Sequence, residues 1–127
     1  MRNQRSRDDG FTLIELLVVI VILGVLAAIA LPTFLNQKTK AYHAMMASDL
    51  HSVVTAEMAL LANNVTPTSD PTALAGEGYH QSQGVTLPHV KLTGANFLVC
   101  LTHPSAGEWL VYDSTTGSTS SSTSDCA

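Results

Sequence analysis

The sequence is poor in basic residues, and this limits the partners that the protein can bind. It has six Lys and Arg against ten Asp and Glu, which gives a formal net charge of -4. Three of the six basic residues are arginines within the first seven positions, and only three lysines follow, scattered over the rest of the chain. A nucleic-acid-binding domain usually presents a basic face. The sequence therefore predicts no direct binding of nucleic acid.

The chain also lacks the residue patterns of common catalytic and metal sites. Its Ser, His and Asp residues fall in predicted loops and tails without a supporting motif, and it has no glycine-rich phosphate loop. The two cysteines, Cys100 and Cys126, do not have the spacing of a zinc site, and the five histidines are scattered. We therefore expect no enzymatic activity, no bound metal and no cofactor.

What the sequence does have is one long apolar run near its start. Phe11 to Leu31 spans 21 residues, and as a helix it would be about 31 Å long, close to the roughly 30 Å hydrocarbon core of a bilayer. Its side chains are apolar on all sides, which is typical of a membrane span rather than of an amphipathic helix. Arginines precede the run and two lysines follow it, a small excess that favours a cytoplasmic N-terminus.

The run carries one carboxylate, Glu15, close to its beginning. An acid inside a bilayer costs on the order of 3 kcal/mol, so it is by default a functional residue that needs a partner. A cleavable secretory signal peptide is the alternative interpretation, because Ala28-Ile29-Ala30 has the small residues of a cleavage site. The length of the run and the presence of Glu15 both oppose that interpretation.

The stretch GFTLIELLVVIVILGVLAAIALP, residues 10–32, resembles the N-terminal motif of type IV pilins and the related pseudopilins. It has the Gly-Phe junction, the acid five residues after that junction, a glycine within the helix and a proline at its end. The rest of the chain is similar to the family in layout, a helix followed by a small disulfide-pinned sheet, with looser agreement in sequence.

The resemblance implies that residues 1–10 are a leader peptide, cleaved between Gly10 and Phe11 by a membrane-embedded prepilin peptidase. The new amine of Phe11 would then be N-methylated. It also implies that residues 11–31 hold the subunit in the membrane until a machinery with a motor ATPase and a platform protein assembles it into a helical filament of identical copies. There Glu15 would pair with the Phe11 amine of a neighbour and set the register, because each charge alone is costly in an apolar setting.

Gly24 and Pro32 mark a weak part of the predicted helix. A proline inside a helix removes a hydrogen bond and costs ~3 kcal/mol, and a glycine weakens a helix by up to ~1 kcal/mol. By resemblance, the corresponding segment is extended in several filaments of the family. A plain kink at Pro32 is the alternative.

Residues 32–64 are predicted to continue the helix as its amphipathic half, to about Asn63. Apolar residues recur there at spacings near three and four: Leu35, Tyr42, Met46, Leu50, Val53, Leu60 and Leu61. Polar residues, among them Asp49 and Glu57, are expected on the remaining surface. A turn-rich stretch beginning at Val65 is predicted to be a surface connection.

The remaining residues, within a head spanning 65–127, are predicted to form about three antiparallel strands, which gives an α+β fold. The strands expected are Val85–Leu92, Asn96–Thr102 and Trp109–Asp113, separated by turn signals. Pro88 has no amide donor, so the first strand should lie at an edge or a bulge. The serine-rich end has the composition of a disordered tail.

Cys126 changes the interpretation of that tail, because a disulfide to Cys100 in the middle strand would tether it to the sheet. Closing a loop of about 26 residues would stabilise the head by roughly 3.5 kcal/mol in the chain-entropy model. A disulfide also indicates an oxidising compartment outside the cytoplasm. Two free thiols are the alternative.

The function expected from the resemblance is that of a type IV pilus subunit, anchored in the inner or cytoplasmic membrane before assembly and extracellular afterwards. Such a pilus would serve adhesion or twitching motility. A competence pilin and a type II secretion pseudopilin are the alternatives within the family. Outside the family, the alternative is a secreted or membrane-anchored binding module whose apolar run is only a signal peptide or an anchor.

Overall fold

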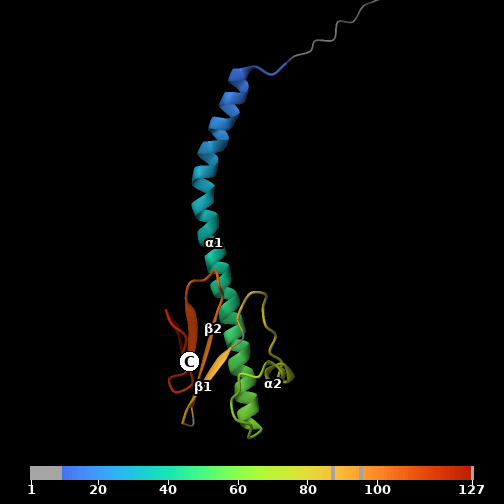
Figure 1. Cartoon of the computed structure of the whole chain (residues 1–127), viewed down its shortest axis with the longest axis vertical. Helices are drawn as coiled ribbons and strands as arrows, with labels where there is room; N and C mark the ends of the chain where they lie inside the picture. The colour runs from blue at the N-terminus through green and yellow to red at the C-terminus, as the bar shows by residue number, and fades with distance from the viewer. Residues whose placement is uncertain (1–9, 87, 95, 127) are drawn as a thin grey trace, which may run out of the picture. The chain divides into compact units, whose positions relative to one another are not determined.

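The structure, a computed structural model, describes residues 10–86, 88–94 and 96–126 (Figure 1). The chain divides into two compact units, one up to Gln37 and one from Lys38 onwards. A single helix, α1, runs from Leu13 to Ala62 and contributes to both units. The predicted leader falls on residues 1–10, of which only Gly10 is among the described residues.

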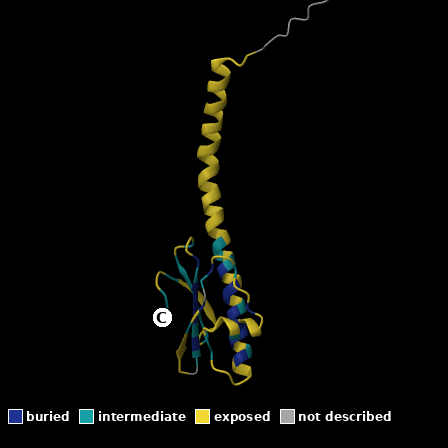
Figure 2. Cartoon of the chain, turned by 45° about the vertical axis from the view of Figure 1, so that its right-hand side comes forward, coloured by how far each residue is buried: buried dark blue, intermediate teal, exposed yellow. Residues whose placement is uncertain are grey.

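Helix α1 changes from fully exposed to partly buried along its length (Figure 2). Every residue from Leu13 to Gln37 is exposed, whereas in the second unit α1 contributes a buried apolar stripe to the core. Four residues of the predicted stripe are buried, which confirms most of it: Met46, Leu50, Val53 and Leu60. The prediction was wrong for Leu35 and Leu61, whose side chains are exposed, and Tyr42 is half-buried.

Two carboxylates that were expected on the surface of α1 are buried instead. The backbone N–H of Thr68 donates to both carboxylate oxygens of Glu57, at 3.0 and 3.2 Å. The backbone N–H and the hydroxyl of Ser82 donate to Asp49 at 2.8 and 2.7 Å. Each carboxylate thus satisfies donors of the chain that follows α1, and this offsets the cost of burying it.

The segment after α1 is more structured than the predicted surface connection. It contains a short helix, α2, from Pro71 to Gly76, whose start is capped by Asp70 through a 2.9 Å hydrogen bond from the Thr72 N–H. Leu74 and Tyr79 are buried in the same apolar core as the stripe of α1. The turn residues predicted the irregular parts of this segment correctly. The burial of Leu74 and Tyr79 was not predicted, because two isolated apolar residues produce no periodic pattern in the sequence.

The sheet is a four-stranded antiparallel meander in the order β1-β2-β3-β4. Its strands are β1 (His89–Thr93), β2 (Asn96–Thr102), β3 (Trp109–Asp113) and β4 (Ser118–Ser122). The second and third strands have the predicted bounds. The first begins at His89 rather than Val85, immediately after Pro88, and its predicted position at an edge is confirmed.

The predictions of about three strands and of a disordered composition in the tail were wrong, because the structure has a fourth strand, β4, in that tail. Its sequence, STSSS, has neither apolar alternation nor β-branched richness, so the composition resembles that of a flexible segment. It forms because its backbone pairs with β3 from Ser118 opposite Asp113 to Ser122 opposite Trp109. The α+β fold class is confirmed, with four strands.

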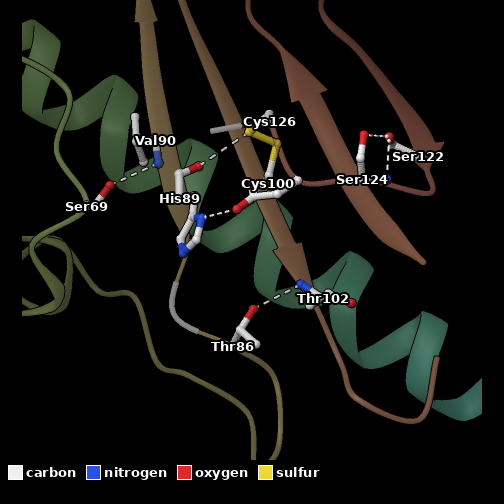
Figure 3. The surroundings of a disulfide bond; sticks show 10 residues. Ser69, Thr86, His89, Val90, Cys100, Thr102, Ser122, Ser124 and Cys126 are labelled. Carbon is white, nitrogen blue, oxygen red and sulfur yellow. Dashed lines mark hydrogen bonds and ion pairs between the residues drawn. A yellow bond between two sulfur atoms is a disulfide. The ribbon is translucent and has the colours of Figure 1, made fainter. Parts of the chain in front are cut away.

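The chain after β4 is fastened to β2 and β1 (Figure 3). Cys100, fully buried in β2, forms the predicted disulfide with Cys126, with 6.0 Å between the Cα atoms. His89 of β1 lies beside this bond, and its Nδ1 is 2.6 Å from a carboxylate oxygen of Asp125. The C-terminal segment therefore has a covalent and a polar attachment to the sheet.

Candidate assembly site at the start of the long helix

Glu15 lies in the first turn of α1 and takes part in a reciprocal cap with Thr12. The backbone N–H and the hydroxyl of Thr12 both donate to Oε2 of Glu15 at 2.9 Å. In return the Glu15 N–H donates to the Thr12 hydroxyl at 3.3 Å. This is the capping-box arrangement, in which a Thr before the helix and a Glu in its first turn satisfy each other's donors.

The cap holds the carboxylate in apolar surroundings. Glu15 lines a shallow hollow of about 390 Å³ whose other walls are apolar: Phe11, Ile14, Val18 and Val19. The Phe11 side chain is 91 % exposed. From Leu16 to Gln37 the chain has no charged side chain, so Glu15 is the single charge available to a partner that approaches this part of the helix.

This half of α1 is long and apolar enough to cross a membrane by length and composition, and none of its most apolar stretch is buried within the chain. Burying such a surface against lipid or against other helices is strongly favourable, because each square ångström of apolar surface removed from water contributes roughly 25 cal/mol. Fully exposed apolar helices are therefore surfaces for association.

Gly24 and Pro32 lie within the continuous helix of the single chain. A Cβ added at Gly24 would meet no other atom within 4 Å, so packing inside the chain does not explain a glycine there. After Pro32, the Thr33 hydroxyl donates to the Ile29 carbonyl at 3.4 Å. Whether this segment opens when copies assemble stays a prediction.

The structure keeps the predicted site residues in two groups. Phe11 and Glu15 lie together in the first unit, and Cys100 and Cys126 are joined in the second. Asp125 and the two sulfur atoms lie within 4.8 Å of one another, a grouping that has the composition of a metal site. The sulfur atoms are bonded to each other, however, and a metal requires the thiolate form.

The capping role of Thr12 was not predicted from the sequence, although its three-residue spacing from Glu15 indicates it. Thr12-Leu13-Ile14-Glu15 has the Thr-x-x-Glu pattern that precedes an apolar run at a helix start. Asp49 and Glu57 were also assigned wrongly, and no local pattern distinguishes them from solvated acids, because their donors lie 33 and 11 residues away in the chain.

Comparison with known proteins shows that the N-terminal part of the chain matches a described protein family. Residues 5–31 match the family described as "Prokaryotic N-terminal methylation motif". The chain is 46 % identical over 66 residues to a fimbrial protein, EcpB, of Eikenella corrodens, covering 52 % of this chain and 42 % of the relative. It is 43 % identical over 68 residues to the type II secretion system core protein G of Aeromonas hydrophila, covering 53 % and 48 %.

Those two matches span about half the length of the relatives, whereas another spans the whole chain. The chain is 30 % identical over 134 residues to the type IV wide pilus major component PilA4 of Thermus thermophilus, and the match covers 99 % of each protein. Together with the exposed apolar helix and its capped acid, this similarity establishes that the chain belongs to the type IV pilin and pseudopilin family.

Proposed function

We propose that the protein is the structural subunit of a type IV pilus, held in the membrane as a prepilin and polymerised through the apolar half of α1. The observation that supports this most is the full-length similarity to a pilus major component. On this proposal the protein works by assembling with copies of itself and catalyses no reaction. Its partners are the membrane, a prepilin peptidase and an assembly machinery with a motor ATPase and a platform protein.

The proposal assigns cleavage to the bond between Gly10 and Phe11, and N-methylation to the new amine of Phe11. Gly10 and Phe11 are both exposed and precede the first helical residue, so a peptidase would reach this bond without unwinding the helix. The leader would remain on the cytoplasmic side, and the head with its disulfide would lie in the oxidising space across the membrane.

Glu15 is the residue proposed to set the register between copies. Both donors of Thr12 use Oε2, so the cap lowers the cost of carrying the carboxylate in apolar surroundings before a neighbour arrives. In the filament the Phe11 amine of the next copy would approach this carboxylate, and the two opposite charges would neutralise each other.

Mass spectrometry of the N-terminus of the mature protein tests the processing steps. A chain that begins with N-methylated Phe11 supports the pilin proposal. A chain that begins at Leu31 would show that the apolar run is a cleaved signal peptide, and it would eliminate filament assembly through α1.

Replacing Glu15 tests the register. Glu15→Leu should leave membrane insertion intact, because it removes a charge from the bilayer, and should abolish filaments or make them sparse. Glu77→Leu is the matched control, since Glu77 is exposed in the head and should tolerate the same chemical change. Abundant normal filaments from Glu15→Leu as the sole subunit would overturn the register argument.

A secretion pseudopilin is the second candidate function, because several relatives that match over the first half carry the name of a secretion system core protein. Deleting the gene separates the two functions. Loss of surface pili with normal export of secreted proteins supports the pilus subunit, whereas loss of export with unchanged pili supports the pseudopilin.

A further inference from the structure

Cys100, Asp125 and Cys126 form the one group of three potential metal ligands among the described residues. Their two sulfur atoms and a carboxylate oxygen all lie within 4.8 Å of one another. Figure 3 shows the two cysteines where the end of the chain meets β2. The cysteines are 26 positions apart in the sequence, so only the fold brings the three ligands together. We name them the tail cluster.

The donor atoms of the tail cluster suit Zn²⁺ once the two sulfur atoms are thiolates. Zinc binds thiolate sulfur at about 2.3 Å and carboxylate oxygen at about 2.0–2.2 Å, in tetrahedral geometry. The ligand atoms of such a tetrahedron are roughly 3.3–3.8 Å apart. Without the bond between the sulfur atoms, rotation of the side chains is enough to bring atoms that lie within 4.8 Å to this spacing. Calcium and magnesium, in contrast, prefer oxygen ligands alone.

His89 holds the carboxylate of the tail cluster. Its Nδ1 is 2.6 Å from Oδ2 of Asp125. A carboxylate has two oxygens, so Asp125 can contact His89 with one and a metal with the other. Such a partner orients the ligand, and its loss typically lowers metal affinity by about 10- to 100-fold.

The tail cluster is open to water on one side. Cys100 is buried, whereas Asp125 and Cys126 are half-buried. The side chains of Asp125 and His89 are 29 % and 49 % exposed. An ion therefore has a path to the three ligands, and a water molecule can take the fourth position of the tetrahedron.

The thiol form of the chain precedes the disulfide. Cysteines are incorporated as thiols, and disulfides form in oxidising spaces outside the cytoplasm. In the thiol form the segment after β4 lacks its covalent attachment to β2. An ion bound by Cys100 and Cys126 would connect the same two parts of the chain.

We propose that the reduced protein binds one Zn²⁺ through the Sγ atoms of Cys100 and Cys126 and a carboxylate oxygen of Asp125, with His89 as a positioning residue. Binding displaces the two thiol protons into water, so it weakens as the pH falls. Zinc and the disulfide exclude each other, because sulfur atoms bonded to each other are not thiolates. The proposal does not depend on the proposed function.

Metal titration of the full-length protein in detergent tests the site. A phosphine first cleaves the disulfide to two thiols and takes an oxygen atom from water to become the phosphine oxide, and it is then removed without air. Co²⁺ serves as the probe, because its bonds to thiolates absorb in the near ultraviolet. Trp109 is the sole tryptophan of the chain and its ring is 5.7 Å from that of His89, so bound Co²⁺ should quench its fluorescence. Displacement of Co²⁺ by Zn²⁺ then measures zinc affinity.

The reduced wild type should bind one ion per chain with both signals, and the oxidised protein should show neither. Cys126→Ser should abolish binding. Asp125→Asn and His89→Ala should each weaken zinc binding about tenfold or more. Glu77→Gln and His51→Ala are the matched controls, since they change a carboxylate and an imidazole at exposed positions outside the tail cluster, and both should keep the wild-type affinity.

Equal zinc affinity of Asp125→Asn and the wild type would show that two thiols alone bind the ion, and it would overturn the proposal. Missing cobalt–thiolate absorption in the reduced wild type would do the same. Limited proteolysis gives an independent measurement. Saturating zinc should protect the C-terminal segment of the reduced wild type and not that of Cys126→Ser, and a segment cut equally fast with and without zinc would contradict the proposal.

Discussion

Tyr79 and Glu57 show how single buried polar groups affect the stability of the head. The hydroxyl of Tyr79 is buried and has no hydrogen-bond partner among the described residues. Burial, and then the nearby charge of Asp49, raise the pKa of Tyr79 to about 12. Burial also raises the pKa of Glu57, although the hydrogen bond from Thr68 lowers it in part. For both groups, folding therefore shifts the protonation equilibrium towards the neutral form relative to the unfolded chain.

Tyr79→Phe should stabilise the protein by about 1 kcal/mol near neutral pH, because the substitution removes an unsatisfied buried hydroxyl and keeps the ring. In the wild type the folded pKa exceeds the unfolded value of 10.0, so stability should be lost as pH rises from 10 towards 12. The variant should lack that loss. Chemical denaturation at neutral and alkaline pH measures both effects, and a destabilised Phe variant would contradict the prediction.

Glu57→Gln should make the stability of the protein less dependent on pH. The folded pKa of Glu57 is raised, so the folded state takes up a proton more readily than the unfolded state, and the wild type gains stability as pH falls through that pKa. The stability of the variant relative to the wild type should therefore be greatest near neutral pH and should decrease as the solution is acidified. Thermal unfolding of both proteins from about pH 5 to 8 tests this, and a constant difference would contradict it.

At the scale of the element, the C-terminal segment shows how a strand without apolar residues is retained. Among the described residues, strand β4 pairs with β3 alone, and an edge strand without an apolar face is marginal. The disulfide between Cys100 and Cys126 and the contact of His89 with Asp125 hold the chain that follows it. The attachments are therefore expected to limit fraying of β4.

Cys100→Ser and Cys126→Ser should each destabilise the protein by roughly 3 kcal/mol and make the C-terminal segment sensitive to protease. The double variant should be no worse than either single variant, because both substitutions remove the same bond. Chemical denaturation and limited proteolysis of the purified proteins measure these effects. Additive losses, or two reactive thiols in the wild-type protein under non-reducing conditions, would show that this bond does not exist.

At the scale of the whole molecule, net charge limits what a filament of this subunit can bind. After Gly10 the chain has three lysines against eight Asp and Glu. Phosphate backbones are bound through basic residues, and like charges repel. A shaft built from this subunit should therefore be acidic and should not attract duplex DNA.

Purified filaments should show no measurable binding to duplex DNA near physiological salt, even if they belong to a DNA-uptake system. Fluorescence anisotropy of labelled duplex titrated with filaments measures this. Micromolar binding that weakens as salt is added would contradict the prediction, and it would favour a competence pilus over an adhesive one.

The sequence by itself determined the features that depend on local pattern and length. The apolar run, the Gly-Phe junction and Glu15 predicted the assembly helix, and α1 ends at Ala62, within one residue of the predicted Asn63. Short apolar runs bounded by turn residues located β2 and β3, and two cysteines permitted only one intramolecular disulfide. Each of these follows from residues that are close in sequence or from a count.

Only the tertiary structure decided the features that depend on a distant partner. Strand β4 forms through backbone pairing that its serines do not encode, and Asp49 is buried because Ser82 reaches it across 33 residues of chain. The exposure of Leu92 is decided in the same way, since a leucine on a strand is ordinarily expected in the core and only the packing leaves this one in the wall of a groove. Hydrogen bonds and packing between segments that are distant in the chain produce no periodic pattern in the sequence. For that reason only the tertiary structure decides which residues they involve.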